Sequence, residues 1–106
     1  MKRFAFIFLV VAMSFSLCSC SKIKSGFLAT QAAMAVNNGN FKKAEQLYQE
    51  MIALEPNVAE HHWYLGTVYI STKEKEKVQK EIAILRRMGR DDLADQMFLL
   101  LYQPVL

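Results

Sequence analysis

Apolar residues over most of the chain recur at steps of three and four, which is the spacing of one face of an α-helix. Three such series follow one another: Phe41, Ala44, Tyr48 and Met51; Val58, His62, Leu65 and Tyr69; and Val78, Ile82 and Leu85. No stretch alternates apolar and polar residues in the way a half-buried strand does. The pattern therefore predicts an all-α protein.

Turn residues divide this helical pattern into segments. Gly39 can adopt the left-handed conformation that closes a helix, and Pro56 cannot continue one. Asn57, with Glu60 three residues later, has the spacing of a capping box and predicts a helix start. The helices predicted from these signals cover residues 26–37, 41–54, 58–70, 74–87 and 91–102.

The first 19 residues have a different pattern. Lys2 and Arg3 form a positive head, and a fourteen-residue apolar run follows from Phe4 to Leu17. Small residues and two cysteines come next, in the order of a secretory signal peptide. A membrane-spanning helix needs about 20 apolar residues, so cleavage is favoured over an uncleaved signal anchor, which stays an alternative.

Leu17, Cys18, Ser19 and Cys20 resemble the lipobox of bacterial lipoproteins. The resemblance implies that residues 1–19 are removed and that Cys20 carries a diacylglycerol and an N-acyl group such as palmitate. It also implies a periplasm-facing bacterial membrane anchor. Ser21, where inner-membrane lipoproteins have Asp, implies outer-membrane sorting. The alternative use of the two cysteines, a disulfide, would close a strained ring across one serine.

Removing the signal peptide changes the charge balance of the chain. The precursor carries a net charge of +3, and the loss of Lys2 and Arg3 lowers it to +1. No stripe of basic residues remains to bind nucleic acid. The mature chain is predicted to comprise a lipidated N-terminus and short polar linker at 20–26, and a helical repeat domain at 27–103.

Small and apolar residues return at an offset of 34, so that Ala44 corresponds to Val78 and Met51 to Leu85. The chain resembles the tetratricopeptide repeat family at these residues: Gly39, Ala44, Tyr48, Pro56, Leu65, Gly66 and Tyr69. The resemblance implies antiparallel helical hairpins, about two repeats followed by a C-terminal capping helix. It weakens at Lys73–Lys77, which replaces the turn glycine of the second repeat.

In that family the first helix of each hairpin lines a concave binding surface. The resemblance therefore implies a protein or peptide partner bound by Ala33, Val36 and Asn37 of one helix and by Trp63, Thr67 and Ile70 of another. Trp63 could equally belong to the core. The segment Met97–Tyr102 is apolar all round. It either covers the open end of the stack or contacts a partner or a second copy.

The sequence gives little support for catalysis or metal binding. His61 and His62 are adjacent, so on a helix they point about 100° apart and do not chelate one ion easily. Asp91, Asp92 and Asp95 sit at a helix start, where negative charge and capping explain them. We expect no enzyme activity, metal or cofactor. The predicted function is a membrane-tethered adaptor in envelope assembly or secretion, and the alternative is an oligomer-forming structural lipoprotein.

Overall fold

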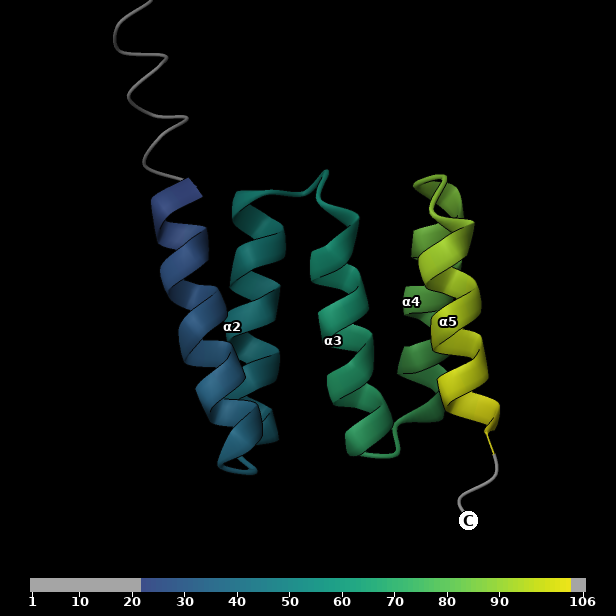
Figure 1. The fold of residues 1–106 in the computed structure, drawn as a ribbon, viewed down its shortest axis with the longest axis horizontal. Coiled ribbons are helices and arrows are strands. Elements are labelled where there is room, and N and C mark those ends of the chain that lie inside the picture. The colour runs from purple at the N-terminus through teal and green to yellow at the C-terminus, as the bar shows by residue number, and fades with distance from the viewer. Residues whose placement is uncertain (1–21, 104–106) are drawn as a thin grey trace, which may run out of the picture.

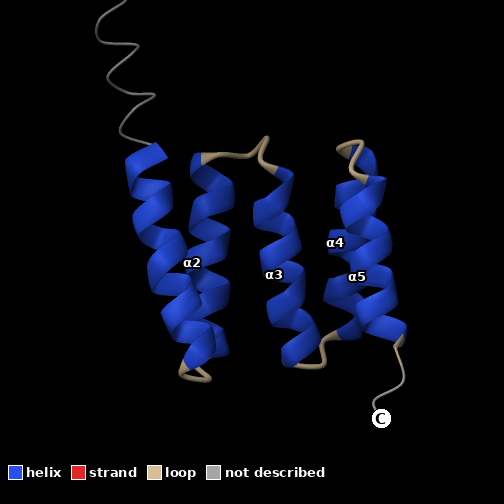
Figure 2. Ribbon diagram, in the orientation of Figure 1, coloured by secondary structure: helices blue, strands red, loops and turns tan. Residues whose placement is uncertain are grey.

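In the computed structural model, residues 22–103 form a row of antiparallel helices joined by short turns (Figure 1). The N-terminal helix covers residues 22–37 and is followed by α2 (Phe41–Leu54), α3 (Ala59–Ser71), α4 (Lys75–Arg87) and α5 (Asp91–Tyr102). Within this range the chain contains only helices and turns (Figure 2). The prediction of an all-α fold of antiparallel helical hairpins is confirmed. The predicted signal peptide at residues 1–19 and the predicted lipid site at Cys20 lie outside the residues that the structure describes.

The helix α3 lies in the middle of the row. Figure 1 shows the hairpin of the N-terminal helix and α2 on one side of α3, and the hairpin of α4 and α5 on the other. Contacts join α3 to α2, α4 and α5, and α4 to α5. The buried apolar residues of this core are Leu28, Ala32, Ala35, Ala44, Tyr48, Met51, Ala59, Leu65, Val68, Tyr69, Val78, Ile82, Leu85, Ala94 and Met97.

Three of the turns between helices have the same geometry. Each contains a residue in the left-handed region: Gly39 at φ 75°, Lys73 at φ 62° and Gly89 at φ 76°. In each, the next residue donates its N–H to the carbonyl five residues earlier: Asn40 to Ala35 at 2.8 Å, Glu74 to Tyr69 at 2.9 Å and Arg90 to Leu85 at 2.9 Å. This is the closure of a Schellman motif. Lys73 therefore occupies the glycine position, 34 residues after Gly39.

Replacing Lys73 with glycine is expected to stabilise the fold. A side chain in the left-handed region costs roughly 1–2 kcal/mol, and the extra freedom of unfolded glycine returns about 0.5–1 kcal/mol of that. The expected gain in the free energy of unfolding is about 0.5–1 kcal/mol, measured by urea denaturation. Ala83→Gly on the exposed side of α4 is the control, with an expected loss of about 1 kcal/mol. Equal losses in both variants would contradict the strain at Lys73.

Two helix starts differ from the prediction. Residues 22–26 are helical rather than a linker, because Ser25 continues the buried series of Leu28 and Ala32. The capping box at α3 does not form. Its N-cap residue is Val58, which makes no side-chain cap bond. The carboxylate of Glu60 instead accepts a hydrogen bond from Arg90 in the α4–α5 turn at 2.7 Å. The side chain of Glu60, which would complete the capping box, is therefore part of an ion pair with Arg90 instead.

Candidate functional site

The six residues predicted to bind a partner lie on two helices. On the N-terminal helix, Ala33 and Asn37 are exposed and Val36 is half-buried against the core. On α3, Thr67 is half-buried and donates its hydroxyl to the carbonyl of Tyr64 at 2.6 Å. Ile70 and Trp63 are half-buried and pack against the core. Exposure therefore leaves Ala33 and Asn37 most open to a partner.

Trp63 makes its visible contacts inside the fold. Its indole meets the ring of Tyr64 edge-on with centroids 5.5 Å apart, and Tyr64 stacks on Tyr48 of α2 at 5.6 Å. The indole Nε1 is buried and has no hydrogen-bond partner among residues 22–103. Tyr64, not Trp63, therefore makes the aromatic contact between α3 and α2, and Trp63 packs against the ring of Tyr64.

The residues that carry the repeat resemblance lie either in the buried core or in the connections between helices. The helical ones are buried: Ala44, Tyr48, Leu65, Gly66 and Tyr69. Gly39 forms a turn, and Pro56 is exposed in the connection between α2 and α3. Gly66 has a specific steric role, because a Cβ at this position would overlap the Sδ and Cε atoms of Met97 on α5. The absence of a side chain at Gly66 therefore lets α5 pack directly on α3.

A buried contact between a histidine and a carboxyl group lies beside this contact. Glu81 of α4 is 7% exposed, and its Oε2 is 2.7 Å from Nδ1 of His62 on α3. Burial raises the pKa of Glu81 above the ordinary value of 4.5, while the hydrogen bond and charge of His62 act in the opposite direction. Sequence reasoning placed His62 in the core but missed its partner. The available signal was that Glu81 lies three residues after Val78 and four before Leu85, on the buried stripe of α4.

His61 belongs to a separate polar cluster. Its Nε2 lies 3.3 Å from Oε1 of Glu55, in the connection between α2 and α3. The pKa of Glu55 is lowered, first by a hydrogen bond from Ser25 and then, against the effect of burial, by His61. Ser25, Glu55 and His61 thus join the N-terminal helix to α3. The two histidine rings engage different carboxylates, and residues 22–103 contain no group of three potential metal ligands.

The aspartates at the start of α5 are paired with arginines rather than gathered around an open site. Asp92 receives two hydrogen bonds from Arg90, both at 3.1 Å, which lower the pKa of its carboxyl group. Asp95 accepts one from Arg86 at 3.0 Å, and Asp91 lies 3.8 Å from the same guanidinium. The N-cap residue Arg90 makes no side-chain cap bond, but backbone amides at the start of α5 also lower the pKa of Asp92, so this carboxylate has both ion-pair and helix-start partners.

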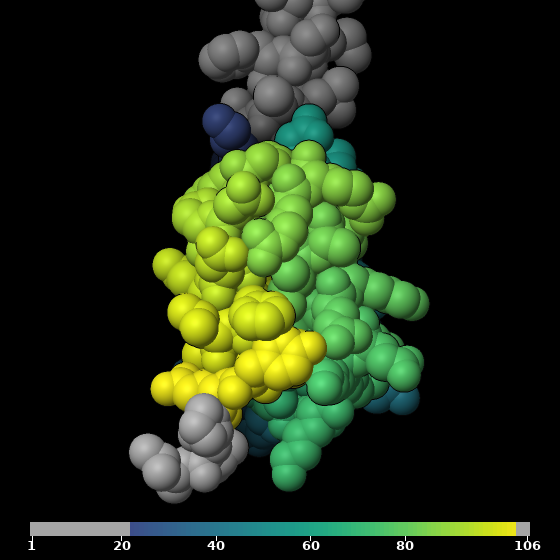
Figure 3. Space-filling view, turned by 90° about the vertical axis from the view of Figure 1, so that its right-hand side faces the viewer, coloured from purple at the N-terminus to yellow at the C-terminus, as the bar shows by residue number. Residues whose placement is uncertain are grey.

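One exposed apolar surface lies at the α5 end of the row. Met97 faces inward and is fully buried, whereas Leu99 is 67% exposed. We call Phe98, Leu99, Leu100 and Tyr102 the C-terminal face, since all four are large and exposed. Figure 3 looks onto this end of the molecule, formed by α4 and α5. The hydroxyl of Tyr102 accepts a hydrogen bond from Gln79 at 3.0 Å, so part of this face is held against α4.

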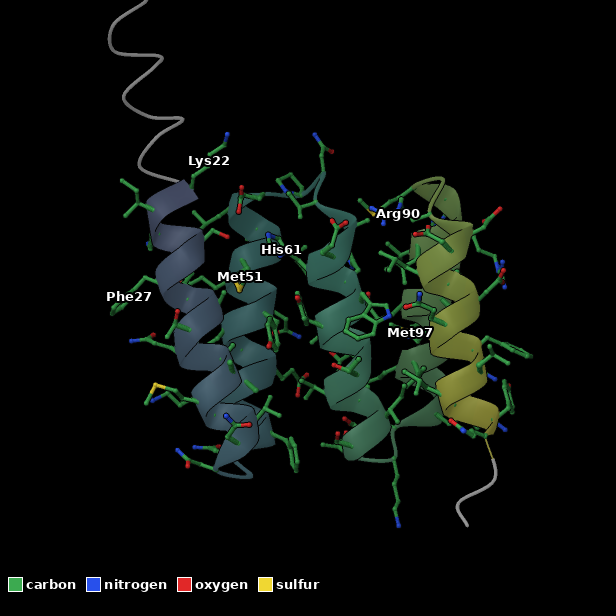
Figure 4. All side chains as sticks on the ribbon, viewed as in Figure 1. Lys22, Phe27, Met51, His61, Arg90 and Met97 are labelled. Atoms are coloured by element: carbon green, nitrogen blue, oxygen red, sulfur yellow. The ribbon has the colours of Figure 1, made fainter. Side chains whose placement is uncertain are left out.

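A second apolar surface lies at the opposite end of the row. Ile23, Phe27 and Met34 of the N-terminal helix are 74%, 64% and 59% exposed, and we call them the N-terminal face. Figure 4 shows Phe27 directed away from the other helices. Beside this face is an open hollow of about 430 Å³ lined in part by Phe27, Met34, Asn40 and Lys43. None of the six predicted binding residues lines it.

Comparison with known proteins does not extend this description. The chain matches no protein-family model, no curated protein and no solved structure. The resemblances to the lipobox and to the tetratricopeptide repeat therefore rest on the residues themselves.

Proposed function

We propose that this protein is a lipid-anchored adaptor that holds a protein partner at the periplasmic side of a bacterial membrane. Two sequence features support the anchor: the signal-peptide pattern of residues 1–19 and the lipobox resemblance ending at Cys20. Among residues 22–103, no helix is both long and apolar enough to cross a bilayer. Outer-membrane sorting, implied by Ser21, and a role in envelope assembly or secretion belong to the same proposal.

The observation that carries the binding half of the proposal is the two-sided character of α5. Its inner side is fixed in the core by Met97, and its outer side exposes the C-terminal face. A large exposed apolar patch is typical of an interaction site, whereas single scattered apolar residues are common on any protein surface. The helical stack acts passively in this function, by presenting that face on a folded support.

The anchor is tested on the full chain expressed in a bacterial host. The protein extracted from membranes is expected to begin at Cys20 and to be heavier than the bare 20–106 chain by a diacylglycerol and an acyl group. Cys20→Ala is expected to block this processing. Cys18→Ala is the matched control and should be processed normally, because Cys18 leaves with the signal peptide. An intact Met1 on the wild-type protein, or a normally processed Cys20→Ala variant, would overturn the anchor.

The C-terminal face also supports a second candidate, a structural lipoprotein that assembles with itself. Sedimentation of the detergent-extracted protein separates the two candidates. An adaptor is expected to sediment as a monomer, alone or in Leu99→Lys form. A wild-type oligomer that Leu99→Lys converts to a monomer would favour the structural subunit. Leu99 is suited to this test because it is largely exposed and contributes little to the core.

A further inference from the structure

The N-terminal face is an exposed apolar surface separate from the C-terminal face. Ile23, Phe27 and Met34 recur at steps of four and seven, so they lie on one side of the helix, opposite the buried Leu28 and Ala32. The N-terminal helix is therefore apolar on two opposite sides, and only one of them is used by the fold. An ordinary surface helix would have a polar outer side.

Charge in this part of the chain is of one sign. Residues 22–43 contain Lys22, Lys24, Lys42 and Lys43 and no Asp or Glu. All ten acidic residues of the protein come later, where they outnumber the seven basic ones. Lys24 lies 3.8 Å from Glu50 of α2, and Lys43 borders the hollow beside Phe27 and Met34. Residues 22–43 thus add only positive charge beside the N-terminal face, and the charge of Lys24 is partly balanced by Glu50.

The chain that precedes the helix limits what can cover this face. The apolar segment 4–17 and the proposed lipid site at Cys20 both end within a few residues of Lys22. Two extended residues reach only about 7 Å, so any membrane attachment brings the bilayer next to the start of the helix. This holds for the lipid anchor and for an uncleaved signal anchor alike.

We propose that the N-terminal face lies on an anionic lipid bilayer, with Ile23, Phe27 and Met34 in the headgroup–acyl boundary and the lysines among the headgroups. This inference rests on the membrane attachment in the proposed function and adds an orientation to it. Helices of this kind enter the interface by about 5–10 Å and gain from basic residues beside anionic lipid. A second copy facing the same surface would bring two sets of lysines together, so charge favours lipid over a symmetric dimer.

The orientation has a direct consequence for the other surface. The N-terminal helix and α5 lie at opposite ends of the row (Figure 1). With the first on the bilayer, the row stands away from the membrane and the C-terminal face points away from it. The apolar surface proposed to bind a partner is then kept out of the lipid.

The test places a tryptophan at the two ends of the full, membrane-extracted protein. Phe27→Trp reports on the N-terminal face, and Ala83→Trp on the exposed side of α4 is the matched control, with the native Trp63 common to both. Each variant is reconstituted into vesicles of phosphatidylethanolamine and phosphatidylglycerol with brominated acyl chains. The brominated chains are expected to quench the fluorescence of the tryptophan at position 27 several-fold, and its emission is expected to shift to the blue. The fluorescence of the tryptophan at position 83 is expected to be unaffected. Neutral phosphatidylcholine vesicles should weaken the quenching.

Two results would overturn the inference. Equal quenching of both tryptophans, or none, would show that the N-terminal face does not lie on lipid. A blue shift without quenching, accompanied by faster sedimentation, would show that another protein or a second copy covers it. The mass of the same preparation distinguishes the two proposals. A lipid-modified protein that floats with vesicles and shows no quenching retains the anchor and loses the orientation, whereas an unmodified mass contradicts the anchor itself.

Discussion

Met97→Ala is expected to lower the free energy of unfolding by about 2–5 kcal/mol, the range for truncating a fully buried methionine. Met97 is 0% exposed and ends against the backbone of Gly66, where no side chain can replace the lost atoms. The loss is large beside the total stability of about 5–15 kcal/mol typical of a small domain. Urea denaturation followed by circular dichroism measures it.

Leu99→Ala is the matched control for this prediction. Leu99 lies on the same helix two residues later but is largely exposed, so the expected change is within about 0.5 kcal/mol. Gly66→Ala adds a third arm, because its new methyl group would enter the space that Met97 occupies. Combined with Met97→Ala, it should cost less than the two separate losses together. Similar stabilities for Met97→Ala and Leu99→Ala would mean that α5 is not docked on α3.

His62→Leu is expected to cost about 3 kcal/mol at neutral pH, because it leaves the carboxylate of Glu81 buried without its partner. Glu81 is 7% exposed, so water cannot easily replace the imidazole. The variant also removes the two effects of His62 that lower the pKa of Glu81. The pKa of the folded state is then raised further above the ordinary value.

The sign of the pH dependence follows from this raised pKa. Below the ordinary glutamate value of 4.5, Glu81 is neutral in both the folded and the unfolded state, and no penalty for burying its charge exists. As the pH rises through the raised folded pKa, the folded state loses stability relative to the unfolded state. The free energy of unfolding of His62→Leu should therefore increase as the pH falls from 7. It should approach the value for the double variant that combines His62→Leu with Glu81→Met.

The double variant is the control, because it has no carboxylate to titrate at this position. Replacing both members of a buried pair with apolar residues is often neutral or stabilising. It should regain most of the stability at pH 7. The difference in unfolding free energy between the single and double variants is the quantity to compare at each pH. A difference that does not change with pH would show that Glu81 is not the titrating group.

Most of the fold could be predicted because its signals are local. The buried positions Ala44, Tyr48 and Met51 follow the period of their own helix, and the turn at Gly39 needs only neighbouring residues. The offset of 34 even identifies Lys73 as the residue that replaces a turn glycine. Local signals failed where a distant group competes for the same atoms. The capping box at α3 is absent because the N-cap residue is Val58 rather than Asn57, and Glu60 instead binds Arg90, thirty residues away.

The candidate sites were harder to predict than the helices. The place of Glu81 on the stripe of α4 indicates that it is buried, but it does not identify His62 of α3 as the residue that it contacts. Ile23, Phe27 and Met34 were visible as apolar residues, but their common exposure depends on which side of the helix α2 covers. Ala33 and Asn37 are exposed, and their role in binding a partner stays a prediction.

The order in which the helices touch has a consequence for how the chain folds. Apart from the contact between α3 and α5, the packed pairs among α2–α5 are neighbours along the chain. Such a low contact order is typical of domains that fold within microseconds to milliseconds. The early hairpins can close before residues 91–102 are available, but Gly66 stays uncovered until Met97 reaches it. We therefore expect docking of the last helix, which covers Gly66 with Met97, to be a late step in folding.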